Sequence, residues 1–214
     1  MSGVVEMMNG QQLFSREDWR QALAARLQAA TVAVCGLGGL GSNIALALAR
    51  AGVGRLLLLD FDRVDLSNLH RQQYKAAQIG QYKTAALAQN LQEIAPYLQT
   101  DLRTVRVTAD NLADLLAPAD IVCEAFDEPE AKAMLVEGVL TQMPEKYLLA
   151  ASGMAGLGTG NMIRSRRVSP HFYLCGDEVS DVADCGALFA PRVMLCAAHQ
   201  ALLAVRIIAG EFDV

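Results

Sequence analysis

The sequence predicts an α/β fold in which a doubly wound, mainly parallel sheet is covered by helices on both faces. Three observations favour it: apolar runs of strand length recur along the chain, helical segments separate them, and each run is hydrophobic almost throughout. Near-continuous hydrophobicity is typical of parallel strands that are buried on both faces. The predicted strands span residues 31–36, 55–60, 103–107, 119–126 and 147–152.

Helices are predicted between these strands. They span residues 42–51, 81–95, 111–116 and 129–140. The second one places its apolar residues on one face and ends at Pro96. Pro129 suits the first position of the last one. A further helix is predicted at about residues 16–29, before the first strand, with Trp19, Leu23 and Leu27 near one face.

The pattern changes after residue 152, where four glycines fall in one short stretch at positions 153, 156, 158 and 160. Two short strands follow, over 161–168 and 171–174, and we expect them as an antiparallel addition to the sheet. An irregular loop over 175–189 leads to a long apolar helix over 191–209.

The chain contains no repeat, low-complexity stretch or linker, so we expect one domain over residues 1–214. Its parts would be an N-terminal helical arm (1–30), a core of alternating strands and helices (31–152) and a C-terminal part (153–214). A domain of this length buries roughly 70% of the surface that its unfolded chain exposes, so it folds without disulfides or metals.

Composition narrows the possible functions. The net charge of −5 and a pI of about 5.2 argue against general binding to nucleic acid or to anionic membranes. No apolar run reaches 18 residues, which argues against a transmembrane helix. The N-terminus lacks the basic segment and apolar core of a secretory signal, so a cytoplasmic protein is expected.

Five cysteines are present, and none form a C-x-x-C pair. We expect free thiols in a reducing compartment. Cys35, Cys123 and Cys196 lie within apolar runs and are expected to be small buried hydrophobes. Cys175 and Cys185 lie in polar, glycine-containing sequence, so their role stays open.

A glycine-rich turn follows the first strand, in T-V-A-V-C-G-L-G-G-L-G-S. Gly36 allows a tight turn, Gly38 lets the backbone approach a phosphate, and Gly41 allows a helix to pack closely on the strand. The helix expected from Ser42 directs its N-terminus at the anion. Asp60 ends the next strand 19 residues after Gly41, where a carboxylate can bind ribose hydroxyls. The context predicts a nucleotide site in a Rossmann-like fold.

Polar residues crowd the segment after the second strand. They are Asp62, Asp65, Asn68, His70, Arg71, Gln72 and Lys75. A triphosphate carries about two more negative charges than a nicotinamide dinucleotide, and a reaction that expels pyrophosphate must neutralise them. Arg71 and Lys83 suit this task, and Asp127 suits magnesium at the same edge of the sheet. Each also has an ordinary explanation: Arg71 and Lys83 as solvated cations, and Asp127 as a helix cap.

Four segments together resemble the ThiF/MoeB family, the ubiquitin-activating-like adenylyltransferases that act on small ubiquitin-fold sulfur carriers. They are G-L-G-G-L-G-S, A-G-V-G-R-L-L-L-L-D-F-D-R-V, S-N-L-H-R-Q and G-Q-Y-K. The resemblance is strong over residues 31–127. It is looser beyond, where S-G-M-A-G-L-G and A-P-R-V-M-L-C-A-A-H-Q look like a short ThiF of the thiamine-thiazole pathway.

The resemblance implies that ATP and magnesium adenylate the C-terminal Gly-Gly carboxylate of a ThiS-like carrier, releasing pyrophosphate, with residues 153–214 on the carrier side. The implied nucleotide-binding residues are Gly36, Gly38, Gly39, Gly41, Asp60, Asp62, Asn68, Arg71, Gln72 and Lys83. Asp127 would hold the magnesium ion. The sequence has no Ser-His-Asp or Cys-His pair at motif spacing, and none is needed, because the substrate's own carboxylate is the nucleophile.

Two features depart from the family. Many members bind structural zinc through two C-x-x-C pairs, but Cys175, Cys185 and Cys196 are spaced by 10 and 11 residues, so we expect no zinc. Members are also usually longer at the C-terminus. We therefore expect a reduced or differently built surface for the globular part of the carrier.

Family members pair as dimers in which an N-terminal arginine reaches the nucleotide of the other subunit. Arg16 and Arg20 are the candidates here, and Arg16 is preferred. Apolar residues such as Trp19 and Leu23, together with those of the last helix, exceed what one sheet accommodates. We therefore expect a two-fold homodimer.

Some family members use a cysteine of the crossover loop to attack the adenylate or to link to the carrier. Cys185 is the better candidate, because Cys175 directly ends a predicted strand. The neighbouring Glu178, Asp181 and Asp184 would raise the pKa of the Cys185 thiol, which favours an unreactive cysteine.

Three other functions remain as alternatives. A sister activator of a molybdopterin-type carrier or of a modified tRNA base would share all the motifs. An NAD-dependent oxidoreductase would share the glycine loop, but its chemistry does not require the charges of Arg71, Lys83 and Asp127. A carrier-binding module without catalytic activity would not need the complete set of residues from Gly38 to Asp127.

Overall fold

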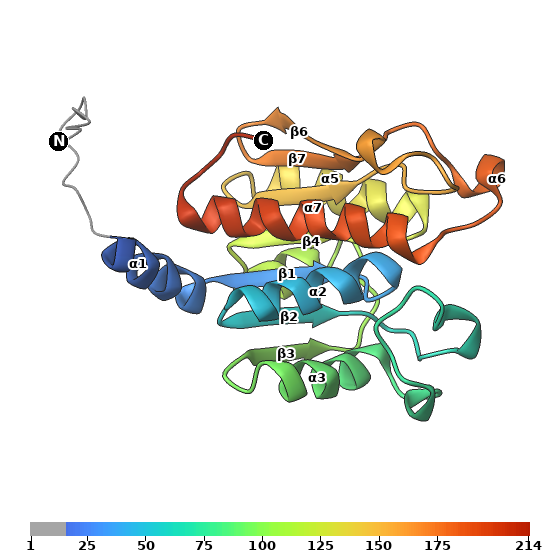
Figure 1. Cartoon of the computed structure of the whole chain (residues 1–214), viewed down its shortest axis with the longest axis horizontal. Coiled ribbons are helices and arrows are strands. Elements are labelled where there is room, and N and C mark those ends of the chain that lie inside the picture. Colours follow the sequence, from blue (N-terminus) through green and yellow to red (C-terminus); the bar gives the residue numbers. More distant parts are fainter. Residues whose placement is uncertain (1–15) are drawn as a thin grey trace, which may run out of the picture.

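The computed structural model describes residues 16–214, except for the side chains of Arg16 and Glu17. One seven-stranded sheet forms its centre, in the order β3-β2-β1-β4-β5-β7-β6 (Figure 1). The strands are β1 (Thr31–Cys35), β2 (Arg55–Leu59), β3 (Gln99–Arg103), β4 (Ile121–Glu124), β5 (Tyr147–Ala151), β6 (Arg164–Ser169) and β7 (Phe172–Gly176). The helices are α1 (Arg16–Ala29), α2 (Gly39–Ala51), α3 (Lys83–Ile94), α4 (Leu112–Leu116), α5 (Pro129–Gln142), α6 (Val182–Cys185) and α7 (Ala190–Ala209).

Strands β1 to β5 are parallel, and the strand order reverses between β1 and β4. The doubly wound, Rossmann-like fold predicted from the sequence is therefore confirmed. The expected antiparallel addition is only half right. β6 and β7 form a hairpin around Pro170, and β7 pairs parallel to β5, so β6 is the one antiparallel strand.

Helices cover both faces of the sheet. α2, α3 and α7 lie in front of it in Figure 1, and α5 lies behind. Successive residues of a strand face opposite sides: Val32 and Val34 join the core under α2 and α7, whereas Ala33 and Cys35 join the core under α4 and α5. Because both faces are buried, every position of β1 is apolar or small, which explains the continuous runs in the sequence.

Helix α7 is apolar over most of its length. Among residues 16–214 it is the one helix that is long and apolar enough to cross a membrane by length and composition, with a mean hydropathy of 1.5. Half of it is buried inside the protein, where Cys196, Ala201 and Ala204 join the core against α2 and the sheet. A core helix of this kind meets the same length and hydropathy criteria.

The predicted strand over 103–107 is wrong, because β3 spans Gln99–Arg103 instead. β3 pairs with β2 from Gln99 opposite Arg55 to Arg103 opposite Leu59, and it ends where β2 ends. As the outer strand at this edge of the sheet, it is half exposed and carries the polar sequence Q-T-D-L-R. The apolar residues Val105 and Val107 follow the strand and line a cleft instead.

Candidate functional site

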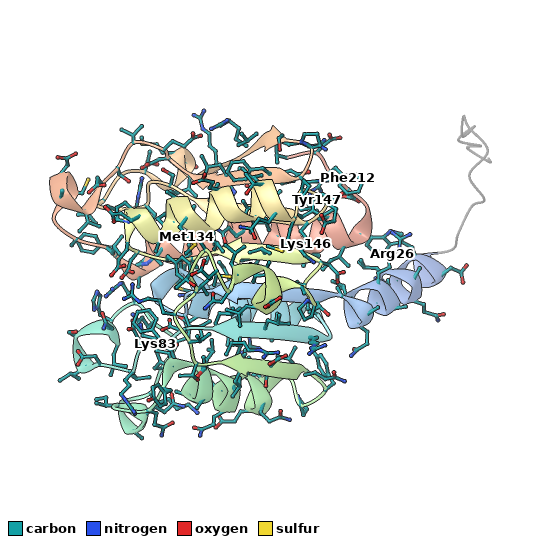
Figure 2. All side chains as sticks on the ribbon, turned by 180° about the vertical axis from the view of Figure 1, so that it is seen from behind. Arg26, Lys83, Met134, Lys146, Tyr147 and Phe212 are labelled. Carbon is teal, nitrogen blue, oxygen red and sulfur yellow. The ribbon has the colours of Figure 1, made fainter. Side chains whose placement is uncertain are left out.

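A cleft of about 950 Å³ opens at the carboxyl ends of β1, β2, β4 and β5, where the strand order reverses. Ten of the predicted site residues line it: Gly36, Gly38, Gly39, Asp60, Asp62, Asn68, Arg71, Gln72, Lys83 and Asp127. Figure 2 shows Lys83 at the end of the molecule opposite to Arg26, Tyr147 and Phe212. The structure thus brings together residues that are spread over 92 positions of the sequence, from 36 to 127.

The glycine loop has the geometry that its spacing predicts. Gly36 has a φ of +92°, which favours glycine, and a Cβ on Gly41 would overlap the Gly36 carbonyl oxygen. Helix α2 begins at Gly39, three residues before the predicted start, with Gly38 as its N-cap. The first bond of the helix runs from the Ser42 N–H to the Gly38 carbonyl, so the N–H groups of its first turn remain free to bind an anion at the cleft.

Asp60 fastens this loop from the end of β2. Its carboxylate accepts hydrogen bonds from the N–H of Leu37 and the N–H of Asp62, both at 2.7 Å. Burial raises the pKa of Asp60, and the nearby charge of Lys83 opposes that rise. Tyr74 donates its hydroxyl to the Leu37 carbonyl at 2.7 Å, so the loop is held on both sides. Sequence analysis missed Tyr74, which lies outside every motif.

Lys83 is fixed in the cleft by acidic partners. Its side chain is only 8% exposed, and its amine lies 2.8 Å from the carboxylate of Asp62 and 3.9 Å from that of Asp60. Its backbone N–H also donates to the Asp62 carbonyl at 2.9 Å. A buried amine needs such partners, so Lys83 is not the ordinary solvated cation of the alternative explanation.

Three polar groups of the cleft have no charged partner within residues 16–214. Arg71 lays its aliphatic stem over Gly39, and within residues 16–214 its guanidinium pairs with no carboxylate. The side-chain amide of Asn68 makes no hydrogen bond in that range. The side-chain carbonyl oxygen of Gln72 is buried and unpaired. Because unpaired buried polar groups are unfavourable, these groups are suited to bind a polar ligand.

Asp127 differs from the other acids of the cleft. Six carboxylates line the cleft: Asp60, Asp62, Asp127, Glu128, Glu178 and Asp181. Five of them have a hydrogen-bond or charge partner in the described chain, and Asp127 has none there. Glu128, not Asp127, is the N-cap of α5, so Asp127 is not the helix cap of the alternative explanation.

The side chains of the cleft fit a magnesium ion that is held mainly by the phosphate oxygens of a bound nucleotide. Among residues 16–214, no three His, Cys, Asp or Glu side chains form a group that could hold a metal ion. Magnesium commonly needs only one or two carboxylates when phosphate oxygens and waters complete its shell. Asp127 supplies one such carboxylate, at the mouth of a loop suited to phosphate.

An ion pair that was not predicted from the sequence, with one buried and one part-exposed partner, lies next to Asp127. Glu124 is fully buried, and its carboxylate lies 2.8 Å from the amine of Lys132. The same carboxylate accepts the N–H of Phe126 at 2.8 Å, and Lys132 donates to the Phe126 carbonyl at 3.1 Å. The pair therefore fixes the turn that carries Asp127. The only signal in the sequence was a charged residue inside a predicted strand.

The remaining predicted residues lie elsewhere. Cys185 is exposed next to Gly156 and does not line the cleft. Cys175 is buried, and burial raises the pKa of its thiol to about 12, in keeping with the preference for Cys185. Arg16 falls in α1, but its side chain lies outside the described residues, so its role in a dimer stays a prediction.

Residues 10–213 match the ThiF family model. The chain belongs to the ThiF family. Curated relatives include the "Adenylyltransferase and sulfurtransferase UBA4" of Candida glabrata, which is 32% identical over 88% of this chain and 44% of the relative. The "Sulfur carrier protein adenylyltransferase" of Thermus thermophilus is 40% identical over 48% of this chain and 38% of the relative. This ThiF chain thus spans less than half the length of these relatives.

Solved structures of similar fold include the E. coli tRNA N6-threonylcarbamoyladenosine dehydratase TcdA in complex with AMP. It has a TM-score of 0.79 at 20% identity and covers 94% of this chain and 98% of TcdA. E. coli MccB has a TM-score of 0.71 at 21% identity, covering 89% of this chain and 58% of MccB. At these identities the likeness establishes the fold of the ThiF chain and not its substrate.

Proposed function

We propose that this ThiF protein adenylates the C-terminal Gly-Gly carboxylate of a small ubiquitin-fold sulfur carrier, ThiS-like, for thiamine thiazole synthesis. The observation that carries the proposal is a set of polar groups at one cleft that have no charged partner within residues 16–214: the cation of Arg71, the amide of Asn68 and the carboxylate of Asp127. The curated relatives named as adenylyltransferases support the same chemistry.

ATP is the nucleotide that the cleft suits. The free N–H groups at the start of α2 and the open space at Gly38 would hold phosphates, since a Cβ there would meet only Gln72, at 3.8 Å. Arg106 stacks on the Phe61 ring, 4.4 Å from its centroid, and both line the cleft. These flat groups suit one side of a nucleobase.

The reaction needs no protein nucleophile. An oxygen of the carrier's terminal carboxylate attacks the α-phosphorus of ATP, the bond from that phosphorus to the pyrophosphate oxygen breaks, and pyrophosphate leaves with its electrons. A terminal carboxylate is ionised near pH 7, so no general base is required. Arg71 and Lys83 would stabilise the charge that develops on the leaving group, and catalysis rests on positioning and electrostatics.

Asp127 would hold magnesium. A bound magnesium ion would offset phosphate charge and orient the phosphate oxygens. The Glu124–Lys132 pair would keep the Asp127 turn in a fixed conformation for this task.

The carrier would approach from the C-terminal part of the chain. Residues 152–155 and 178–182 also line the cleft, and we name these two segments the carrier-side wall. They lie at the carboxyl ends of β5 and β7, beside the nucleotide residues at the ends of β1 and β2. An extended carrier terminus between them would bring its carboxylate to the α-phosphate.

A homodimer in the cytoplasm completes the proposal. The apolar side chains of Trp19 on α1 and of Leu195 and Leu202 on α7 are 56%, 42% and 60% exposed. A second copy of the chain would cover these residues. Sedimentation at micromolar concentration should give twice the chain mass, and a 23 kDa species would contradict the dimer.

A second candidate is activation of a modified tRNA base. It is favoured by the nearly complete mutual coverage of this chain and TcdA, although that likeness concerns the fold. The net charge of −5 argues against it, because RNA binding draws on a basic surface. A sister carrier of the molybdopterin type is equally compatible with the cleft.

One experiment separates these functions: ATP–pyrophosphate exchange with each Gly-Gly-ended carrier of the source organism, with tRNA as a separate arm. The control is each carrier without its last glycine. We expect exchange with one intact carrier and none with the truncated form. Exchange that depends on tRNA alone would replace the proposed function with the second candidate. NAD binding by calorimetry, without any exchange, would instead favour an oxidoreductase.

A further inference from the structure

The two segments of the carrier-side wall are joined to each other. The Asp177 N–H donates to the Gly153 carbonyl at 2.9 Å, and the Glu178 N–H donates to the Ser152 carbonyl at 3.0 Å. Neither segment belongs to a strand or a helix over its cleft-lining part, apart from Val182 at the start of α6. The spacing of the wall therefore depends on contacts outside the regular sheet.

A buried ion pair lies behind the wall. The side chains of Arg192 and Asp177 are 6% and 1% exposed, and the guanidinium donates to one carboxylate oxygen of Asp177. Arg192 also donates to the carbonyls of Gly158 and Thr159, which follow the first segment of the wall. A single guanidinium thus holds both segments in place.

The other carboxylate oxygen of Asp177 continues this network toward the cleft. It accepts the N–H groups of Val179 and Ser180 at 3.0 and 2.8 Å, and the Ser180 hydroxyl at 3.0 Å. The Ser180 hydroxyl oxygen in turn accepts the N–H of Ala155 at 3.0 Å. Val179, Ser180 and Ala155 all line the cleft, so a continuous chain of hydrogen bonds connects Arg192 to both segments.

Glycines make this close packing possible. A Cβ on Gly153, whose φ is +78°, would overlap the Asp177 carboxylate. A Cβ on Gly158 would lie 2.7 Å from a guanidinium nitrogen of Arg192. Two of the three glycines of S-G-M-A-G-L-G, Gly153 and Gly158, thus leave room for the ion pair behind the wall.

Stability alone is a weak reason for an arginine at this position. Arg192 lies in the first turn of α7, where the positive end of the helix dipole disfavours a cation. Its Nε is buried without a partner. A buried ion pair is often no more stabilising than apolar residues of similar volume. Within residues 16–214, the guanidinium of Arg192 makes its hydrogen bonds to Asp177 and to the carbonyls of Gly158 and Thr159.

We propose that Arg192 and Asp177 are positioning residues for the C-terminal segment of the carrier, because together they set the spacing of the carrier-side wall. This inference rests on the proposed function. It concerns the carrier alone: Arg192 and Asp177 do not line the cleft, and the nucleotide residues belong to other elements. Loss of the pair should therefore weaken carrier binding and leave nucleotide binding intact.

The kinetic test uses Arg192→Met, which keeps length but removes charge, and Asp177→Asn, which keeps shape but removes the charge that holds Arg192. In carrier-dependent exchange we expect the KM for carrier to rise on the order of 10-fold, because a buried charge partner is lost, while the KM for ATP stays within about twofold. The matched control is Asp101→Asn on the distant strand β3, which removes a charge paired with Arg55 of β2. It should change neither constant.

A second readout needs no substrate. By NMR-detected hydrogen exchange, the amides of Ala155, Val179 and Ser180 should exchange at least about tenfold faster in both variants, with amides of β1 and β4 unchanged. If the wild-type protein adenylates no carrier, the proposed function is refuted, and this readout separately decides whether the ion pair holds the wall. Should Arg192→Met fail to fold, Asp177→Asn decides by the same criteria. An unchanged KM for carrier, parallel rises in both KM values, or unchanged amide exchange would each overturn the inference.

Discussion

The amine of Lys83 lies between two carboxylates, 2.8 Å from Asp62 and 3.9 Å from Asp60, at the start of α3. Asp60 in turn holds the glycine loop through the Leu37 N–H, so one cation and two acids connect α3, the end of β2 and the phosphate loop. In Lys83→Met, two neighbouring carboxylates would lose their common cation. We expect ATP affinity and exchange rate both to fall, which calorimetry and the exchange assay would detect. Unchanged ATP affinity would contradict the role of Lys83.

Arg71→Ala should reduce the exchange rate without affecting stability. Loss of one preorganised charge partner typically slows a reaction on the order of 10²–10³-fold. Because Arg71 pairs with no carboxylate in residues 16–214, denaturant unfolding should show no loss of stability. Arg50→Ala, on the exposed end of α2, is the control. If Arg71→Ala exchanges pyrophosphate at the wild-type rate, the guanidinium does not act on the triphosphate.

Asp127→Ala should alter the magnesium dependence of exchange. Its carboxylate has no partner in the described chain, so its removal should not destabilise the fold. We expect the magnesium concentration for half-maximal exchange to rise and the maximal rate to fall. The measurement is a magnesium titration of exchange at fixed ATP, beside Asp110→Ala as a control at an exposed site that does not line the cleft. An unchanged titration curve would exclude Asp127 as the metal ligand.

Glu124→Ala should strongly destabilise the protein. It leaves the Lys132 amine and the N–H of Phe126 without their buried partner. Breaking a buried ion pair by removing one partner typically costs about 3–5 kcal/mol. Urea unfolding of Glu124→Ala, compared with Glu124→Gln, measures this cost, and Glu124→Gln should lose less. Equal stability of all three proteins would mean that the pair does not hold the Asp127 turn.

Acid unfolding should separate Asp177 from Asp60, because their pKa values shift in opposite directions. For Asp177, burial opposes ionisation, but hydrogen bonds from Ser180, Val179 and Arg192 outweigh it and lower the pKa below 3.8. A lowered pKa contributes stability above the unfolded value that is lost as pH falls through the folded value. For Asp60, burial raises the pKa, so its contribution is present below 3.8 and is lost as pH rises through the folded value.

The measurement is urea unfolding between about pH 2 and pH 7. Asp177→Asn should flatten the acid limb of the stability profile. Asp60→Asn should flatten the opposite slope on the neutral side of pH 3.8. Two parallel profiles, displaced by a constant amount from that of the wild-type protein, would contradict both assignments.

Cys185→Ser should leave pyrophosphate exchange at the wild-type rate, because Cys185 does not line the cleft. Of the five cysteines, four are buried and Cys185 is exposed, so a thiol reagent should label one cysteine rapidly in the native protein and none in this variant. Downstream sulfur transfer, assayed separately, decides whether the thiol has a role. Normal exchange with lost transfer would identify Cys185 as a catalytic thiol.

The central strands could be predicted from sequence, and the nucleotide side of the cleft could be predicted from the ends of those strands. β1, β2, β4 and β5 are buried on both faces and leave long apolar runs, and the polar residues after them meet at one edge of the sheet. β3 could not be located this way, because a half-exposed edge strand lacks the apolar run. The strongest apolar signal nearby, at Val105 and Val107, belongs to the cleft.

The supporting ion pairs could not be predicted, because they join residues in no recognisable spacing. Glu124 and Lys132 are eight residues apart, and Asp177 and Arg192 are fifteen apart across a loop and a helix start. The two partners of each pair meet only because the folded chain places their elements side by side. A lone charge in an apolar run, such as Glu124, is the one trace that such a pair leaves in sequence.

The antiparallel strand β6 closes one side of the sheet with three arginines, Arg164, Arg166 and Arg167. An outer strand exposes unpaired backbone groups that can attract the outer strand of another copy. Two such arginine-rich edges would repel each other, which discourages the growth of fibrils or continuous sheets between copies. Self-association through the outer edge of β6 is therefore disfavoured.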